Sequence, residues 1–173
     1  GLPVALISPI AVYECWNPTL GDDVSHPGYA GADKRLKAPL RASPDGLCLY
    51  RCLVAAADFP RYIAATDRQR TMWAERLRCK TIAQLKSYGL KVQARRLALS
   101  GSAGYPDEPD FYYLSEAANL GFEVCQDGLP APLPYGGRPI TATVCYCKVA
   151  DGAGHLSDHY DLQQVHYDRD LVG

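Results

Sequence analysis

Several features of membrane, repeat and low-complexity proteins are absent from this sequence. No apolar run is long enough to cross a bilayer, no unit recurs at a fixed period, and no tract is compositionally biased. The opening residues, GLPVALISPI, have no positively charged region and no clear cleavage site, so we expect no signal peptide. These absences leave an ordinary globular protein, and 173 residues with 47% hydrophobic side chains are enough for one domain spanning 1–173.

An initiator methionine is also absent, because the chain begins with glycine. We interpret this start as a cut boundary, either of an ordinary domain or of a segment excised from a longer viral or mobile-element polyprotein. Proline and glycine alternate frequently over residues 1–40, which predicts a loop-rich N-terminal arm with one short strand near 4–13.

The cysteines do not have the pattern of a disulfide framework. A secreted disulfide scaffold is shorter than this chain, and its cysteines stand in loops. Here the cysteines are odd in number and stand in apolar or helical surroundings. We therefore expect buried thiols in a reducing compartment, the cytoplasm, or the host cytoplasm if the source is viral. The seven cysteines are Cys15, Cys48, Cys52, Cys79, Cys125, Cys145 and Cys147.

The charges are unevenly distributed, although the net charge is only −1. Residues 61–97 carry ten basic and two acidic side chains, whereas residues 105–173 carry three basic and eleven acidic ones. This pattern fits two solvated faces, or a partner surface whose acidic half receives a basic peptide. The basic segment lacks the interleaved aromatic residues of a single-strand groove, so we do not expect a nucleic-acid partner.

The hydrophobic pattern predicts helices in the first part of the chain and strands in the last. Apolar periodicity, a capping Asp110 and closing glycines predict helices, and β-branched content predicts strands. The predicted helices cover 47–57, 67–88 and 110–120, and the predicted strands cover 122–126, 140–149 and 159–167. Loops are expected over 101–109, 128–139 and 151–157. This order indicates an α+β domain with helices packed on a small sheet.

The stretch SPDGLCLYRCL, residues 43–53, ends a tight turn on a cysteine where a helix begins. A thiol in the first turn of a helix is exposed to the positive end of the helix dipole, which favours the thiolate. Gly46 permits close backbone approach, and neighbouring N–H groups can bind a developing oxyanion. Cys48 is therefore a candidate nucleophile, and the alternative is an ordinary small core residue. Cys52, one turn later, is interpreted as structural.

A cysteine nucleophile needs a base, normally histidine, oriented by a carboxylate or an amide. The sequence His-Tyr-Asp occurs twice near the end of the chain, at 159–161 and at 166–168. In a strand, residues i and i+2 point to the same side, so each histidine is expected to have a carboxylate beside it.

These motifs carry a resemblance to a known family. DGLCLYR, residues 45–51, resembles the Asp-Gly-Asn-Cys-Leu-Phe-Arg signature of the ovarian tumour (OTU) family of cysteine proteases. HYDLQQV at 159–165 resembles the closing strand of that family, and FYYLSEAANLGFEVC at 111–125 resembles the helix and strand between them. The resemblance implies an OTU-like fold, with a small sheet packed between helices and the nucleophile at a helix N-terminus.

The resemblance further implies a deubiquitinase, which cuts the bond after the C-terminal Gly-Gly of ubiquitin or a ubiquitin-like protein. It assigns Cys48 as the nucleophile, His159 as the general base, Asp161 as the residue that orients the base, and Asp45 as a brace of the oxyanion loop. It implies no metal and no cofactor, and the basic tail of ubiquitin suits the acidic half of this chain. Leu47 stands where the family has asparagine, so any contribution of that side chain is lost.

Several alternatives remain open at this point. His166 is a second candidate base, although its position near the chain end favours a surface histidine. A zinc site is a rival, with the pattern of Cys145, Cys147, His155 and His159, but the glycine-turned Cys-x2-Cys knuckle is missing. A non-catalytic ubiquitin-binding module and a polyprotein-processing protease are the other two.

Overall fold

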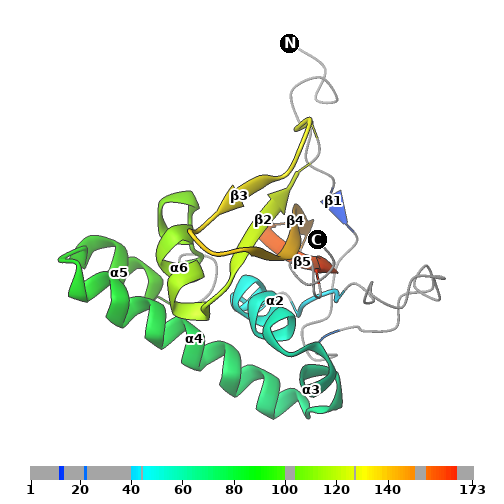
Figure 1. Ribbon diagram of the computed structural model, residues 1–173, viewed down its shortest axis with the longest axis horizontal. Coiled ribbons are helices and arrows are strands. Elements are labelled where there is room, and N and C mark those ends of the chain that lie inside the picture. The colour runs from blue at the N-terminus through cyan, green and yellow to red at the C-terminus, as the bar shows by residue number, and fades with distance from the viewer. Residues whose placement is uncertain are drawn as a thin grey trace.

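The computed structural model describes residues 12–13, 22, 40–43, 45–99, 104–126, 128–150 and 155–166. Most of the predicted N-terminal arm therefore lies outside the described residues, and so do 151–154 of the predicted 151–157 loop. Within the arm, Val12–Tyr13 forms strand β1, at the end of the strand predicted near 4–13. Figure 1 shows the helices gathered beside the sheet, with the longest helix, α4, running beneath α2 and α6.

The three predicted helices are confirmed, and two short ones were not predicted. Helix α4 begins with a capping box, in which Thr66 and Gln69 satisfy each other's backbone amides. Helix α6 ends at Asn119, whose φ of 59° is left-handed, two residues before the glycine expected to end it. The helices are α2 (Cys48–Ala57), α3 (Phe59–Ala64), α4 (Asp67–Ser87), α5 (Lys91–Leu97) and α6 (Phe111–Ala118), with a 3-10 turn at Glu108–Asp110.

The strands form one mixed sheet in the order β1-β4-β2-β3, with β5 paired to β4 as well. β4 is parallel to β1 and β2, while β5 is antiparallel to β4 and β3 is antiparallel to β2. The three predicted strands are confirmed, although the last begins at Leu156 rather than His159 and so takes in part of a predicted loop. The bounds are β2 (Gly121–Cys125), β3 (Leu133–Tyr135), β4 (Ile140–Ala150) and β5 (Leu156–Val165).

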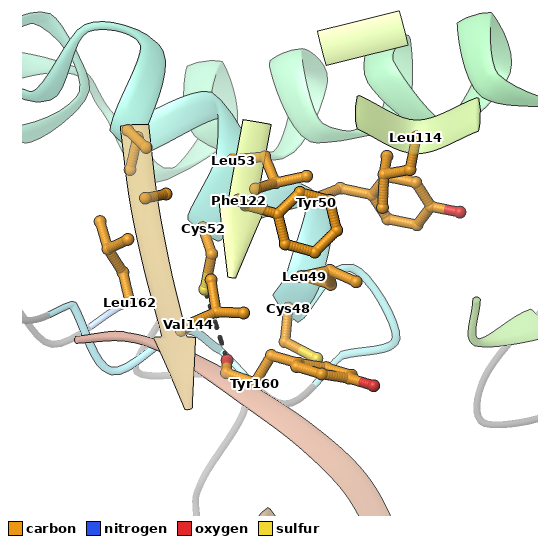
Figure 2. Close-up of a cluster of buried hydrophobic side chains, with 14 of the residues drawn as sticks. Cys48, Leu49, Tyr50, Cys52, Leu53, Leu114, Phe122, Val144, Tyr160 and Leu162 are labelled. Carbon is orange, nitrogen blue, oxygen red and sulfur yellow. Dashed lines mark hydrogen bonds between the residues drawn. The ribbon is translucent and has the colours of Figure 1, made fainter. Parts of the chain in front are cut away.

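The hydrophobic core lies between this sheet and the helices. Phe122, Val144 and Leu162 point from the sheet toward Leu53 of α2 and Leu114 of α6, as Figure 2 shows. The two helices that pack on the sheet, α2 and α6, also contact each other, so they lie on one face of it. The expected placement of the sheet between helices is therefore wrong for the described part of the chain.

The opposite face of the sheet carries polar side chains in the described part of the chain. Thr143 of β4 and Glu123 of β2 are hydrogen-bonded there, with 2.7 Å between Oγ1 and Oε1.

As for the membrane, none of the helices in the described ranges is both long and apolar enough to span a bilayer.

Candidate active site

Cys48 is the first residue of α2, as the turn before it predicts. Gly46 has a φ of 85°, a left-handed conformation that glycine adopts without steric cost, and this lets the turn lead directly into the helix. Leu47 is the N-cap and makes no side-chain bond to the helix. The first amides of an α-helix have no acceptor within the helix, so the amide of Cys48 is available to an anion beside its own sulfur.

His159 and Asp161 lie side by side on β5, in the arrangement that strand alternation predicts. His159 Nε2 is 2.7 Å from Asp161 Oδ1. The same carboxylate oxygen accepts the backbone N–H of Ala42 at 2.9 Å. Asp161 is therefore fixed from two sides, and it fixes the orientation of the imidazole in turn.

Cys48 and His159 are brought together across the junction of α2 and β5. Burial alone lowers the pKa of His159, but hydrogen bonds with Asp161 and Cys48, together with their charges, raise it to about 10. The imidazolium is thus the favoured form of His159 at neutral pH. Because Nε2 is bonded to Asp161, Nδ1 is the ring nitrogen left for the thiol. Nδ1 is buried and has no hydrogen-bond partner among the described residues.

Asp45 ties the turn before Cys48 to the body of the helix. Its Oδ1 accepts the Leu47 N–H at 3.1 Å, and its Oδ2 accepts Arg51 Nη2 at 2.5 Å. Arg51 is only 2% exposed and also donates to Thr71 Oγ1 of α4 at 2.8 Å. The bracing role that the family resemblance implies for Asp45 therefore has a partner, Arg51, which sequence reasoning did not assign. The sequence contains a signal for this partner, because Arg51 is the last residue of the DGLCLYR motif.

Arg51 also belongs to a buried charge network that includes Asp22. Asp22, the one described residue between 14 and 39, has a fully buried side chain. Its Oδ1 accepts the Ser43 N–H at 2.8 Å, and its Oδ2 accepts the Tyr62 hydroxyl. Arg51 Nη1 lies 3.7 Å from the same carboxylate. This network links Asp22 to the segment before α2 and, through Arg51, Tyr62 and Thr71, to α2, α3 and α4.

Two tyrosines cover the sulfur. Figure 2 shows Cys48 beside the ring of Tyr160, which is buried in the core. Tyr105 lies close to Cys48 on the turn before α6, and its side chain is hydrogen-bonded to the Gly46 backbone. Arg96 holds this turn by donating to the Tyr105 carbonyl at 2.5 Å. Because Cys48 is only 1% exposed, a substrate carbonyl reaches the sulfur only after this cover moves.

Cys52 lies one turn after Cys48 and has a different environment. Its Sγ donates to the Tyr160 carbonyl at 3.5 Å, the dashed line in Figure 2. It is completely buried, and burial raises the pKa of its thiol well above the usual range. This thiol is a core group, as its position one helical turn further along predicts.

His166 lies away from Cys48. Its Nε2 is 2.6 Å from Thr143 Oγ1 and 3.7 Å from Glu123 Oε1, on the polar face of the sheet. The side chain is 4% exposed, so the expectation of a surface histidine is wrong: strands β2 and β4 cover it. Its sequence partner Asp168 lies outside the described residues.

The zinc pattern is not gathered into a site. In the chain as described, no group of three or more His, Cys, Asp or Glu side chains is arranged to hold a metal ion. The described residues include Cys145, Cys147, His155 and His159, so these four do not form such a group. The six cysteines of the described residues are thiols, and among them Cys79 on α4 is exposed.

A groove with acidic side chains lies next to the catalytic candidates. It has a volume of about 190 Å³, and its lining includes Asp107, Glu108, Asp158 and Tyr160. Asp158 directly precedes His159 and is bonded to Lys148 Nζ and to the Tyr146 hydroxyl, each at 2.5 Å. The groove thus combines carboxylates with aromatic walls, and one of these walls is Tyr160, which lies beside Cys48.

Comparisons with known proteins give distant similarity to solved structures and none to the other proteins compared. No protein-family model matches the chain, and no curated protein sequence matches it. Among solved structures, the chain is similar to the OTU domain of OTUD1, with 15% identity over 69% of this chain and 79% of that chain and a TM-score of 0.35. A similarity at this level establishes neither the family nor the activity, which therefore depend on the residues of the site.

Proposed function

We propose that this chain is a cysteine protease that hydrolyses the bond after the C-terminal Gly-Gly of ubiquitin or a ubiquitin-like modifier. The observation that supports it most directly is the contact of Cys48, at the start of α2, with His159, whose other ring nitrogen is 2.7 Å from Asp161. A thiol, an imidazole and an orienting carboxylate are the three groups that nucleophilic cysteine catalysis requires.

The reaction follows from these positions. The proton of the Cys48 thiol resides on His159 Nδ1, which the raised pKa of His159 favours, and the thiolate attacks the carbonyl carbon of the scissile bond. The Cys48 amide donates to the resulting oxyanion, while the Leu47 amide is bonded to Asp45 and shapes the turn instead. The imidazolium then protonates the leaving amine, and a thioester remains on Cys48. Water, activated by neutral His159, hydrolyses the thioester and restores the thiol.

The surroundings of the sulfur support a Gly-Gly substrate. Tyr105 and Tyr160 both lie close to Cys48, so residues with no side chain are accommodated best between them. The adjoining groove contains Asp107, Glu108 and Asp158, which suit the basic residues ahead of the two glycines of ubiquitin. The implied substrate class therefore agrees with the charge of the groove.

The test is a ubiquitin that carries an electrophile at its C-terminus. We expect a mass increase of one ubiquitin in the unaltered chain and none in Cys48→Ala. Cys79→Ala is the matched control, because Cys79 is an exposed thiol that any nonspecific electrophile reaches first. Labelling that disappears in Cys79→Ala and persists in Cys48→Ala contradicts the proposal. Tight binding of ubiquitin with no labelling supports a non-catalytic module instead.

A further inference from the structure

The basic segment 61–97 borders a cavity that the proposed chemistry does not use. The cavity has a volume of about 270 Å³ and is lined by residues of α2, α4 and α6, whose arrangement Figure 1 shows. Its apolar wall includes Val54 and Ala57 from α2, Trp73 and Leu77 from α4, and Ala118 from α6. Val54, Trp73 and Ala118 are only partly buried, so this wall remains open to a ligand.

The rim of the cavity is cationic. Four charged side chains line it, and Arg61, Arg76 and Lys80 are positive while Asp58 alone is negative. Asp58 is already engaged as the N-cap of α3, where its side chain accepts the Arg61 N–H. The guanidinium of Arg61 lies 4.4 Å from the centre of the Trp73 ring, which places a fixed positive charge directly on the apolar wall.

Other basic residues of the same segment have internal roles, and the rim residues do not share them. Arg70 donates to the Tyr62 carbonyl at 2.8 Å, and Arg78 donates to the Leu97 carbonyl at 2.8 Å. Those two arginines stabilise the connections of α4 to α3 and α5. Arg76 and Lys80, by contrast, are exposed and stand four residues apart on the face of α4 that borders the cavity.

We propose that this basic-rimmed pocket binds an acidic segment of a partner protein, which inserts one or two apolar side chains between α2 and α4. Its volume is below the roughly 300–1,000 Å³ of small-molecule sites, so it suits side-chain anchors rather than a whole metabolite. An apolar centre with Trp and Arg at its edge has the composition of interface hot spots. The charge of the rim selects Asp and Glu on the partner. A nucleic acid is disfavoured, because Trp73 is the single aromatic residue of the lining.

The pocket and the proposed protease site lie at opposite ends of α2, so they can be tested separately. Val54 and Ala57 follow Cys48 by six and nine residues, which is about 9 and 14 Å along the helix axis. Binding at the pocket therefore does not require a reactive thiol. A Cys48→Ala chain is a suitable bait, because failure of the protease proposal leaves this experiment unchanged.

The experiment is selection of binders from a displayed library of random 12-residue peptides on the Cys48→Ala chain. We expect enriched peptides with a Leu, Phe or Trp within four positions of two or more acidic residues. Affinities are measured by isothermal titration calorimetry, which reports binding in the same way for every variant and peptide. Ala57→Trp, a substitution at an exposed position that fills the cavity, should weaken binding at least about 20-fold.

The rim supplies a second variant that does not alter packing. The double variant Arg76→Glu with Lys80→Glu should bind the same peptides at least about 10-fold more weakly. Added salt should also reduce peptide binding to the unaltered chain. The proposal is overturned if no peptide is enriched, or if the enriched peptides bind the Ala57→Trp and rim variants as well as the unaltered chain. It is also overturned if a 20-nucleotide oligothymidine binds through the rim while no peptide does.

Discussion

The two His-Tyr-Asp segments share a sequence and have different surroundings, and the comparison shows what makes a histidine catalytically useful. Burial does not distinguish them, because the side chains of His159 and His166 are 5% and 4% exposed. Their partners do. His159 is bonded to a carboxylate and to a thiol, whereas His166 is bonded to the Thr143 hydroxyl with Glu123 further away.

Position along the sheet accounts for this difference. His159 is paired with Cys147 of β4, and the backbone N–H of His166 donates to the Thr141 carbonyl of the same strand. Thr141 and Cys147 are six positions apart, which is about 20 Å along an extended strand. His159 therefore stands at the end of the sheet that meets the start of α2, and His166 stands at the other end, out of reach of Cys48.

The largest expected effect is the loss of the base. His159→Ala should reduce kcat/KM by about 10³-fold, because the thiol then has neither a proton acceptor nor an imidazolium to protonate the leaving amine. His166→Ala, the matched variant, should change kcat/KM by less than about threefold. Hydrolysis of a ubiquitin C-terminal fluorogenic amide measures both. The opposite ranking of the two variants would show that the assignment of the base is wrong.

The next effect concerns the carboxylate that orients the base. Asp161→Ala should lower kcat by roughly 10²-fold and leave measurable turnover, since it frees the ring of His159 without removing it. It also removes the acceptor of the Ala42 N–H, so the free energy of unfolding should fall by about 1 kcal/mol. An Asp161→Asn variant keeps an acceptor oxygen and should recover most of the rate. Equal losses in the two variants would show that charge, rather than orientation, is what Asp161 contributes.

A smaller effect should appear in the pH dependence of the catalytic activity. The pKa of His159 is raised to about 10 against the burial that lowers it, through its bonds with Asp161 and Cys48. Activity that needs the imidazolium should therefore persist at neutral pH and decline as the pH approaches 10. In Asp161→Asn the decline should occur at lower pH, because a neutral amide stabilises the imidazolium less. An alkaline limb that does not move in this variant contradicts the assigned cause.

The raised pKa of His159 also predicts that the folded state loses stability as the pH rises. Between pH 6.5 and about 10 the folded chain holds a proton on His159 that the unfolded chain has lost. The stabilisation is complete below pH 6.5 and is lost as the pH rises toward 10. Urea unfolding over this range should show the decline, and it should be weaker in Asp161→Asn.

The sequence predicts those parts of the fold that have a local signal. α2, α4 and α6 have helix-forming residues and end signals, and β4 is rich in β-branched residues. α3 and α5 are shorter than two turns and have few buried residues, so periodicity does not reveal them. Asp58 with Pro60 at the start of α3 was nevertheless a usable start signal, and it was interpreted only as the end of α2. β3 contains Pro134, which is tolerated because β3 is an edge strand.

The site was predictable to the extent that short motifs encode it. Cys48 follows from the turn before α2, and the pairing of His159 with Asp161 follows from strand alternation. The cover over the sulfur depends on Tyr105, which is more than fifty residues from Cys48 and has no motif of its own. The surroundings of His166 depend on side chains of two other strands. Local patterns specify which residues share a face of an element, and only tertiary packing specifies what faces them.

The smallest expected effect is at the His166 cluster, and it tests whether this second histidine is purely structural. Thr143→Val preserves the shape of a 4%-exposed side chain and removes the hydroxyl that joins His166 to Glu123. The free energy of unfolding, measured in urea, should fall by about 1–3 kcal/mol because two buried polar groups lose a partner. Activity should stay within about twofold.

Thr81→Val is the control for this prediction. The Thr81 hydroxyl is also buried, but it donates to the Leu77 carbonyl one turn earlier, an acceptor already engaged in the helix, so its loss should cost less. Equal losses at the two positions would show that the cluster adds nothing beyond a single buried hydroxyl. A tenfold fall in activity in Thr143→Val would show that the polar face of the sheet supports the catalytic end, and the two histidines would then have to be treated as one connected system.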